Sequence, residues 1–331
     1  MGEKRMIAVL GAGAWGTALA AAMVSAGNGV RLWGRDTAVC REINETRRNS
    51  AFLGDAALPG GLDATTSLEA ALDGADVVLI VIPAQAISRI AGLLAGATPL
   101  GNGVPLVVCA KGIDRESGLL PAQTLEKVLP GRAIAALSGP SFAADIVRGK
   151  PTAVTLAASQ MDAALQLSEQ LSGPNLRVYA SDDLTGVELG GALKNVIAVA
   201  VGACRGMELG ASAEAALITR GFRELMRIAT ALGARNETLM GLSGLGDLVL
   251  TCSSPQSRNF SYGMKLGQGV STEGLPLAEG AFTAGVAARI AKERGIEAPL
   301  TTMVAAMVEG RLTAGEAKQA LLARPLKSEG E

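Results

Sequence analysis

Hydrophobic residues in the first half of the chain form short runs, separated by turn residues and by helical patterns. The run at residues 7–10 ends in a glycine-rich turn, and an alanine-rich helical segment follows at residues 17–23. Residues 76–82 are almost continuously apolar, as expected of a strand buried on both faces, and Pro83 ends the run. Strands that alternate with helices predict a parallel, doubly wound sheet.

Further apolar segments fit the same sheet. Residues 30–33 predict its second strand, and residues 105–110 and 133–137 predict two more, each followed by a polar or glycine-rich turn. Residues 152–156 and 176–179 extend the sheet, and antiparallel pairing is open for these two.

The pattern changes beyond about residue 182, where the strand signals vanish. Residues 212–232 and 280–294 carry apolar positions at helical spacing. We therefore predict an α/β protein with an N-terminal Rossmann-type domain over residues 1–182 and an all-helical C-terminal domain over residues 183–331.

Composition narrows the class of protein. The chain has 331 residues, of which 49% are hydrophobic but only 3% aromatic, so its core must be aliphatic and rich in alanine. The formal net charge is −1, and the sequence has no basic stripe of the kind that binds nucleic acid. We therefore expect no nucleic-acid partner. No apolar run of about 18 residues lacks a charge, so we expect no membrane-spanning helix.

The four cysteines lie far apart and have no metal-ligand spacing, so we expect reduced thiols and no metal site. The N-terminus leads directly into the first strand, which excludes a cleaved signal peptide. We therefore expect a cytoplasmic protein. The chain contains no histidine, so any proton transfer must use Lys, Asp, Glu, Tyr or Cys.

The first turn has the glycine spacing of a dinucleotide-binding site. Gly11 permits a tight turn, Gly13 lets the backbone approach a pyrophosphate, and Gly16 lets the following helix pack against the strand. The N-terminus of that helix offers unpaired N–H groups to phosphates. This context predicts NAD or NADP as the cofactor.

Ligands of an open α/β sheet bind beyond the carboxyl ends of its strands. Lys111 follows one predicted strand. Gly139 and Ser141 follow another, with Ser141 expected to cap the next helix. Arg35 follows the second strand, where an arginine accommodates the 2′-phosphate of NADP. Asp36 comes next, and an acidic residue there favours NAD, so NADPH is favoured but not fixed; an ordinary surface charge is the alternative for Arg35.

Residues 186–203 are apolar on nearly every helical face, yet they include Glu188, Lys194 and Asn195. Burying an unpaired lysine is energetically costly. Burial also disfavours the ammonium form, which suits a lysine to donate or accept a proton near neutral pH. Lys194 is therefore a candidate proton donor, and an ion pair with Glu188 is the alternative.

Residues 241–263 are rich in glycine and small hydroxyl residues. Within them, Ser257, Arg258 and Asn259 stand in series ahead of a possible helix, where several donors gather for a phosphate. A surface loop with an incidental arginine is the alternative. Asp247 and Thr251 lie in the same stretch.

Taken together, these segments resemble the bacterial NAD(P)-dependent glycerol-3-phosphate dehydrogenases over essentially the whole chain. The resemblance rests on an ordered set of motifs: GAGAWGTALA, LWGRD, CAKGI, SGPSFA, LGGALKNVIA, ALITRG, GLGDLVLTC, QSRN, YG and LGQG. It implies reversible hydride transfer between NAD(P)H and dihydroxyacetone phosphate, which gives sn-glycerol 3-phosphate for phospholipid synthesis. It also implies a homodimer.

The resemblance assigns roles to individual residues. Lys194 is similar to the family's catalytic proton donor or acceptor, and Lys111 to the lysine that reaches both cofactor and substrate; Asp247 is expected to orient Lys194. The substrate positions are Lys111, Gly139, Ser141, Lys194, Asp247, Ser257, Arg258 and Asn259. The cofactor positions beyond the glycines are Ala14, Trp15, Arg35, Lys111, Ala143, Arg258, Leu277 and Glu279.

Two other functions compete with this interpretation. A related β-hydroxyacid dehydrogenase or ketopantoate-type reductase also combines a Rossmann domain, a helical domain and a catalytic lysine, but acts on carboxylates. A cofactor-binding sensor without catalysis would keep the glycine turn, but would not need Lys111, Lys194 and Asp247 together.

Overall fold

The computed structural model describes residues 5–96, 100–101, 103–275 and 278–323. Its contacts divide the chain into two compact units, and both are discontinuous in sequence. The first unit comprises Met1–Gly191 and Gly233–Asp247, and the second comprises Ala192–Leu232 and Leu248–Glu331. The predicted division between residues 182 and 183 stays a prediction.

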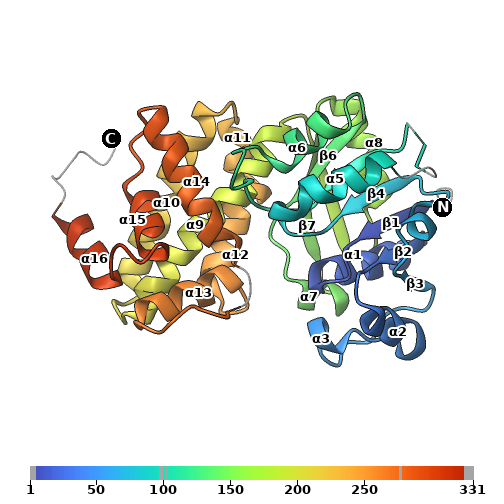
Figure 1. Ribbon diagram of the computed structural model, residues 1–331, viewed down its shortest axis with the longest axis horizontal. Coiled ribbons are helices and arrows are strands. Elements are labelled where there is room, and N and C mark those ends of the chain that lie inside the picture. Colours follow the sequence, from blue (N-terminus) through green and yellow to red (C-terminus); the bar gives the residue numbers. More distant parts are fainter. Residues whose placement is uncertain (1–4, 97–99, 102, 276–277, 324–331) are drawn as a thin grey trace. The chain divides into compact units, whose positions relative to one another are not determined.

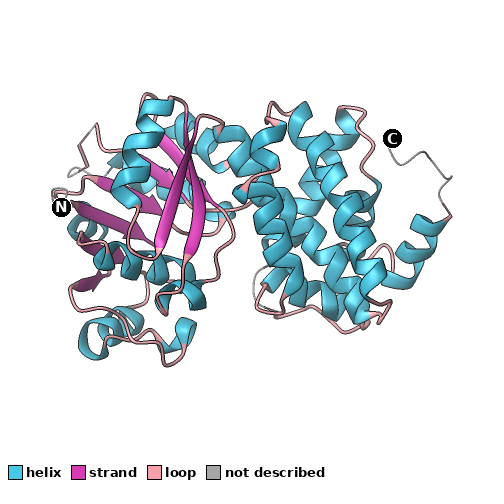
Figure 2. Ribbon diagram, turned by 180° about the vertical axis from the view of Figure 1, so that it is seen from behind, coloured by secondary structure: helices cyan, strands magenta, loops and turns pink. Residues whose placement is uncertain are grey.

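The first unit is built on an eight-stranded sheet, which is magenta in Figure 2. Its strands are β1 (Met6–Leu10), β2 (Gly29–Trp33), β3 (Leu62–Thr65), β4 (Val77–Ile80), β5 (Leu106–Val108), β6 (Ile134–Ser138), β7 (Thr152–Ala158) and β8 (Leu176–Ser181). Their order is β3-β2-β1-β4-β5-β6-β7-β8. All neighbours are parallel except β6 and β7, while β8 pairs in parallel with β7.

Helices cover both faces of this sheet, because alternate residues of each strand point to opposite sides. Ile7 and Val9 of β1 belong to one apolar core, whereas Ala8 and Leu10 belong to the other. The first core is covered by α1 (Ala14–Ser25), α2 (Thr37–Thr46) and α8 (Met161–Leu171). The second is covered by α4 (Leu68–Leu72), α5 (Ile87–Gly96) and α6 (Pro121–Val128).

Shorter helices complete the first unit. They are α3 (Ser50–Leu53), the 3₁₀ turn η1 (Ala84–Ala86), α7 (Ala143–Val147), α11 (Asn236–Leu239) and the π-helical turn η2 (Leu242–Gly246). Beyond β8, the described residues form only helices, turns and loops. The predicted fold class, a Rossmann-type doubly wound sheet followed by helices, is confirmed.

The described residues of the second unit form helices, turns and loops. Its elements are α10 (Ala211–Ala231), α13 (Arg258–Gly267), α14 (Glu279–Glu293), α15 (Pro299–Val308) and α16 (Ala314–Leu322), with most of α9 (Leu184–Gly206) and α12 (Asp247–Ser253) (Figure 1). Its core packs residues of α9, α14, α15 and α16 against one another.

Helix α9 contributes apolar residues to a small cluster in the first unit and to the core of the second. Leu184 and Val187 pack against Ala136 of β6 and Ala157 of β7 in the first unit. The later turns, including Val199, form the centre of the second unit's core. Among the described helices, α9 is the one long and apolar enough to cross a membrane, but its apolar window is fully buried inside the protein, as in a core helix.

Glycines set the close packing of α9 against α13. A Cβ atom at Gly202 of α9 would lie 2.1 Å from the carbonyl oxygen of Phe260, and one at Gly263 of α13 would lie 2.1 Å from that of Val199. The missing side chains let the two backbones touch. The N-terminus of α13 is thereby fixed on the central helix of its unit.

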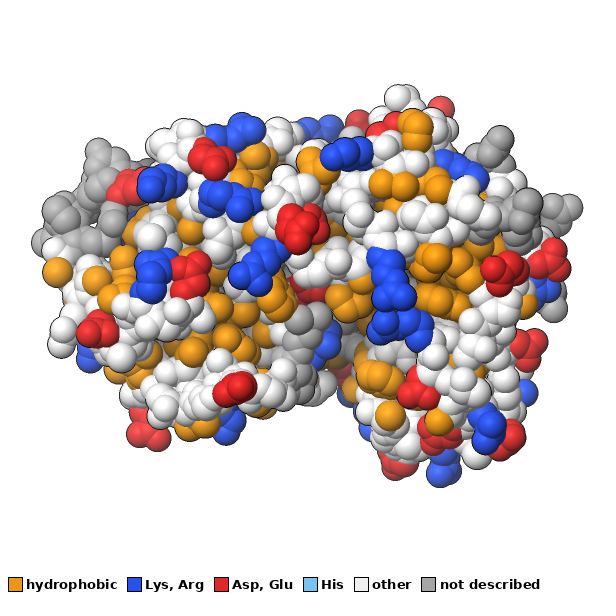
Figure 3. All heavy atoms as spheres, viewed as in Figure 1, with side chains coloured by type: hydrophobic (Ala, Val, Ile, Leu, Met, Phe, Trp, Pro, Cys, Tyr) orange, Lys and Arg blue, Asp and Glu red, His pale blue; other side chains and the backbone are white. Residues whose placement is uncertain are grey.

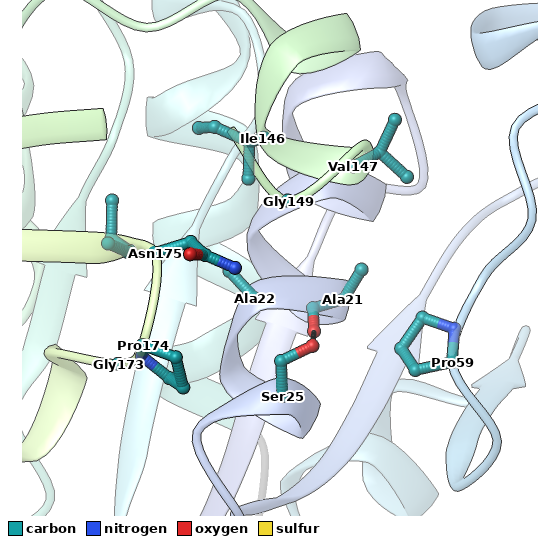
Figure 4. Close-up of a pocket in the computed structure, with 11 residues that line it drawn as sticks. Ala21, Ala22, Ser25, Pro59, Ile146, Val147, Gly149, Gly173, Pro174 and Asn175 are labelled. Carbon is teal, nitrogen blue, oxygen red and sulfur yellow. Dashed lines mark hydrogen bonds between the residues drawn. The ribbon is translucent and has the colours of Figure 1, made fainter. Parts of the chain in front are cut away.

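A small cavity of about 60 Å³ lies beside the C-terminal end of α1 (Figure 4). Ser25 lines it and donates a hydrogen bond to the carbonyl of Ala21. This volume holds a few water molecules, and it is far below that of a cofactor site. The surface in Figure 3 carries acidic and basic side chains side by side.

Candidate active site

The glycine turn after β1 has the geometry that its spacing predicts. Gly11 has φ of +127°, and a Cβ atom there would lie 2.2 Å from the carbonyl oxygen of Val81. A Cβ atom at Gly16 would lie 1.8 Å from the carbonyl oxygen of Gly11. By contrast, a Cβ atom at Gly13 would meet no atom within 4 Å. Gly11 and Gly16 therefore permit the tight packing, while Gly13 faces open space.

This turn fits a dinucleotide pyrophosphate. Gly13 is the N-cap of α1, no side chain caps the helix, and its first turn contains no acidic residue. The helix therefore presents its N–H groups and partial positive charge without a competing anion. Next to it, the buried Trp15 Nε1 has no hydrogen-bond partner among the described residues. An orphaned donor beside a free helix N-terminus suits a ligand with acceptor oxygens.

Arg35 and Asp36 differ in their local bonds. The Asp36 carboxylate accepts hydrogen bonds from the backbone N–H groups of Ala38, at 2.8 Å, and Val39, at 3.3 Å, and so caps α2. Arg35 is exposed, and it makes no ion pair within the described part of the chain. One carboxylate oxygen of Asp36 therefore holds the start of α2, whereas the exposed Arg35 guanidinium is available to a ligand.

Lys111 and Asp247 form an ion pair in the first unit. The Lys111 Nζ donates to Asp247 Oδ2 at 2.7 Å and to the carbonyl oxygen of Gly139 at 2.9 Å. The Asp247 side chain is 2% exposed and that of Lys111 is 18% exposed. The pair therefore presents a fixed ammonium group with one accessible side.

Glycines on α9 and η2 let the chain pack closely around this pair. A Cβ atom at Gly191 would lie 3.3 Å from Lys111 Cγ, and one at Gly190 would lie 2.9 Å from the carbonyl oxygen of Ser243. Gly244 packs even closer, since its Cβ atom would lie 1.9 Å from the carbonyl oxygen of Leu239. The π-helical turn then delivers Asp247 as the first residue of α12. Such turns are frequent at functional sites.

Ser141 does not cap α7, contrary to the expectation from its position. The N-cap is Phe142, without a side-chain bond, and α7 begins at Ala143. The Ser141 Oγ instead donates to the carbonyl oxygen of Gly139 at 2.9 Å. Gly139 has φ of +147°, which turns the chain away from β6. This turn moves the hydroxyl one position too far from the helix to accept its first N–H groups.

Lys194 is buried in the second unit, with 5% of its surface exposed. Its Nζ donates a hydrogen bond to Thr251 Oγ1 of α12 at 2.5 Å. Glu188, the alternative ion-pair partner, accepts a hydrogen bond from the backbone N–H of Ala122 at 2.9 Å. Burial raises the pKa of Glu188 to about 8, so this carboxyl group is protonated at neutral pH.

Ser257, Arg258 and Asn259 lie where α13 begins. The Ser257 Oγ accepts a hydrogen bond from the backbone N–H of Phe260 and is the N-cap. Asn259 Nδ2 donates to Asn195 Oδ1 at 2.8 Å, and Asn259 Oδ1 accepts from the N–H of Gly280 at 2.8 Å. Arg258 is exposed in the first turn. These bonds fix a helix N-terminus beside an accessible guanidinium group.

Two side chains of this arrangement had no assigned role in the sequence analysis. Thr251 follows Asp247 by four positions, one turn of α12, and that spacing is a signal for a shared helix face. Asn195 follows Lys194 directly, and its contact with Asn259 joins segments that are far apart in sequence. Glu279 is the first residue of α14, while Leu277 lies outside the described residues.

Comparison with known proteins explains why these elements occur together. The model of the "NAD-dependent glycerol-3-phosphate dehydrogenase N-terminus" matches residues 6–164, and that of the corresponding C-terminus matches residues 183–319. The chain belongs to this family. It is similar to a glycerol-3-phosphate dehydrogenase [NAD(P)+] of Chelativorans sp. (strain BNC1), with 59% identity over 99% of this chain and 100% of the relative.

Solved structures of the glycerol-3-phosphate dehydrogenase family share the fold. The crystal structure of the enzyme from Coxiella burnetii is 37% identical, with a TM-score of 0.91 over 97% of this chain and 99% of that one. A ketopantoate reductase from Ralstonia eutropha is 18% identical, with a TM-score of 0.62 over 96% of this chain and 100% of that one. That likeness concerns the fold alone.

Proposed function

We propose that the protein is an NAD(P)-dependent sn-glycerol-3-phosphate dehydrogenase, which reduces dihydroxyacetone phosphate to supply glycerol phosphate for phospholipids. Membership of the family and the chemistry of its side chains support this function. The strongest support for this function is a buried lysine, Lys194, on the helix against which the start of α13 packs. Reduction of a phosphorylated ketone requires a proton donor and a site that binds the phosphate.

Lys194 acts as the general acid in reduction and as the general base in oxidation. The cofactor supplies or accepts a hydride at nicotinamide C4. Reduction of a ketone develops negative charge on its oxygen, and a buried ammonium group both stabilises that charge and delivers a proton. The hydrogen bond to Thr251 Oγ1 restricts the position of Lys194 Nζ.

The substrate phosphate binds at the start of α13. Arg258 supplies a planar donor, and Ser257 and Asn259 flank it on the same helix N-terminus. Binding energy from this non-reacting group aligns the carbonyl group for hydride transfer. Lys111, Gly139, Ser141 and Asp247 bind the remainder of the substrate.

The cofactor binds through the glycine turn, with NADPH favoured over NADH. Arg35 pairs with the 2′-phosphate, while Asp36 uses Oδ1 to cap α2. The other cofactor contacts are Ala14, Trp15, Lys111, Ala143, Arg258, Leu277 and Glu279.

Oxidation of NADPH, followed by its absorbance, tests this function. We expect activity with dihydroxyacetone phosphate and little with unphosphorylated dihydroxyacetone, because the latter lacks the group that Arg258 holds. Activity with ketopantoate or another 2-oxo acid, and none with the phosphate ester, would assign the protein to the carboxylate-specific reductases. A protein that binds NADPH without turning over any of these substrates would be a sensor.

We also infer that the enzyme is a cytoplasmic homodimer that needs no metal. Among the described residues, no three His, Cys, Asp or Glu side chains are grouped to hold an ion. Lys194 supplies the charge that a metal provides in other dehydrogenases. Full activity after treatment with EDTA, and a dimer mass in analytical ultracentrifugation, are the expected results.

A further inference from the structure

Asn49 lies against the glycine turn, although it is 38 residues away from Gly11 in the chain. It precedes α3 and is completely buried. Its Nδ2 donates to the carbonyl oxygen of Ala12 at 3.0 Å and to Thr17 Oγ1 at 2.8 Å. One side chain therefore joins the middle of the turn to the first part of α1.

The orientation of the Asn49 amide follows from its partners. The carbonyl oxygen of Ala12 only accepts hydrogen bonds, so the amide must direct its NH₂ group toward the turn. Asn49 Oδ1 is then buried, and it has no partner among the described residues. A buried acceptor without a partner is unfavourable, so the two donated bonds must be important enough to retain an asparagine here.

The backbone of Asn49 is also held. Its carbonyl oxygen accepts hydrogen bonds from the N–H groups of Phe52, at 3.1 Å, and Leu53, at 2.8 Å. Just before it, the carbonyl oxygen of Arg47 accepts from the N–H of Leu58 at 2.8 Å. The asparagine therefore reaches the turn from a segment that is itself fixed.

Planarity of the peptide bond transmits this contact to Gly13. The described chain contains no cis peptide bond, and in a trans peptide the N–H points opposite to the carbonyl group. Because Asn49 binds the carbonyl oxygen of Ala12, the N–H of Gly13 in the same peptide plane points away from Asn49. Apart from its chain neighbours, no atom lies within 4 Å of the position of a Cβ at Gly13, and the residue is half-buried, so part of its backbone is open to a ligand.

We propose that Asn49 is a positioning residue for the cofactor pyrophosphate, which orients the Ala12–Gly13 peptide so that the N–H of Gly13 faces the phosphate oxygens. This inference rests on the proposed cofactor, and it adds a residue outside the glycine motif to the pyrophosphate site. Asn49 itself does not contact the ligand. Without it, the peptide is free to rotate its carbonyl dipole toward the anion, which repels it.

Asn44 provides a matched control in the same unit. Its Nδ2 donates to the carbonyl oxygen of Ala64 at 2.8 Å, and its Oδ1 accepts from the N–H of Ala64 at 2.8 Å. Like Asn49, it makes two hydrogen bonds outside its own helix, but both go to β3 instead of the glycine turn. Asn44 is exposed, so Asn44→Ala loses the same number of hydrogen bonds from a less buried side chain, without touching the Ala12–Gly13 peptide.

The experiment measures the dissociation constant of ADP-ribose, which carries the pyrophosphate, and of adenosine 2′-monophosphate, which does not. Both are measured by competition with NADPH fluorescence on the full-length protein, after thermal unfolding has shown that each variant is folded. For Asn49→Ala we expect ADP-ribose binding to weaken about tenfold, the typical effect of losing one hydrogen bond to a charged group. Binding of the 2′-monophosphate should change by less than about twofold, as should both ligands with Asn44→Ala.

Thr17→Val is a second test if Asn49→Ala does not fold. It is isosteric and removes one of the two acceptors that orient the amide, so ADP-ribose binding should weaken by a smaller factor of about three. Unchanged ADP-ribose binding in either folded variant overturns the proposal, and so do equal losses in Asn49→Ala and Asn44→Ala. A wild-type protein that does not bind NADPH would instead contradict the proposed cofactor.

Discussion

Lys194 is a buried, charged side chain in a helix that is otherwise largely apolar. Lys194→Met keeps the length of the side chain and removes its charge, so we expect folding and cofactor binding to survive. The loss should fall on kcat, by at least about 100-fold, as is typical when a general acid is removed. The pH profile of glycerol 3-phosphate oxidation should also lose the limb that reports the deprotonated base.

An exposed lysine of the same unit serves as the control for this change. Lys265→Met, on α13, removes the same charge at the surface and should leave kcat unchanged. A folded Lys194→Met protein with nearly normal kcat would move the proton donor elsewhere, and Lys111 is the next candidate.

Arg35 determines the choice of cofactor in our proposal. Arg35→Asp should raise the KM for NADPH much more than the KM for NADH, because the new carboxylate repels the 2′-phosphate and accepts a hydrogen bond from a ribose hydroxyl. Arg41→Asp, an exposed position on α2, makes the same change in net charge and should affect neither cofactor selectively. Equal losses with both cofactors for Arg35→Asp would show that Arg35 does not contact the 2′ position.

Glu188 predicts a pH-dependent stability. Its pKa is raised to about 8 by burial, so between pH 5 and pH 8 the folded protein keeps a proton that the unfolded chain has released. The free energy of unfolding should therefore fall with rising pH in this window, by at most about 1.4 kcal/mol per pH unit from this group.

Glu188→Gln should remove that component of the pH dependence. The glutamine keeps a carbonyl oxygen for the N–H of Ala122, but it does not titrate. Denaturant unfolding at several pH values should show the variant gaining stability relative to wild type as the pH rises. A constant difference between the two proteins would mean that Glu188 is ionised in the folded state.

At the scale of elements, the contact between α9 and α13 depends on glycine. Gly263→Ala places a Cβ atom against the carbonyl oxygen of Val199, so the helices must separate, at a cost of about 1–3 kcal/mol in stability. Because α13 begins with Arg258, the affinity for glycerol 3-phosphate should fall as well. Both are measurable, by denaturant unfolding and by calorimetric titration.

A second helical glycine shows what the same substitution does without a close neighbour. A Cβ atom at Gly285 of α14 would only reach Glu309 Oε1, at 3.5 Å. Gly285→Ala should therefore be neutral or stabilising by about 0.5–1 kcal/mol, because alanine favours the helix. Similar losses in both variants would show that the tight contact at Gly263 is not what matters.

Apolar runs and their turns were enough to predict the buried strands and the change to helices. Strand β3 was not predicted, because Leu62–Thr65 is short and Asp63 is exposed, so its sequence lacks an apolar run. Gly11 and Gly16 were predicted correctly to permit close packing, because each of them meets a local steric demand. The contacts of Lys111 with Asp247 and of Lys194 with Thr251 are long-range, and no local pattern specifies them.

At the scale of the whole molecule, the two units share a helix. Side chains of α9 pack in a small apolar cluster of the first unit and in the core of the second. The chain passes from one unit to the other at residues 191/192, 232/233 and 247/248. We expect a single calorimetric unfolding transition, with equal calorimetric and van't Hoff enthalpies, because loss of either core exposes part of α9. Two resolved transitions would show that the units unfold independently.

These three crossings also limit how the gene can recombine with that of a relative. Exchange at any one point before residue 248 gives a chimera in which at least one unit is drawn from both parents. Exchange after that point still divides the second unit, since residues 192–232 then come from one parent and the end of the chain from the other. Unlike two consecutive domains, the sheet unit and the helical unit of this protein therefore cannot both be inherited whole from different parents through one exchange.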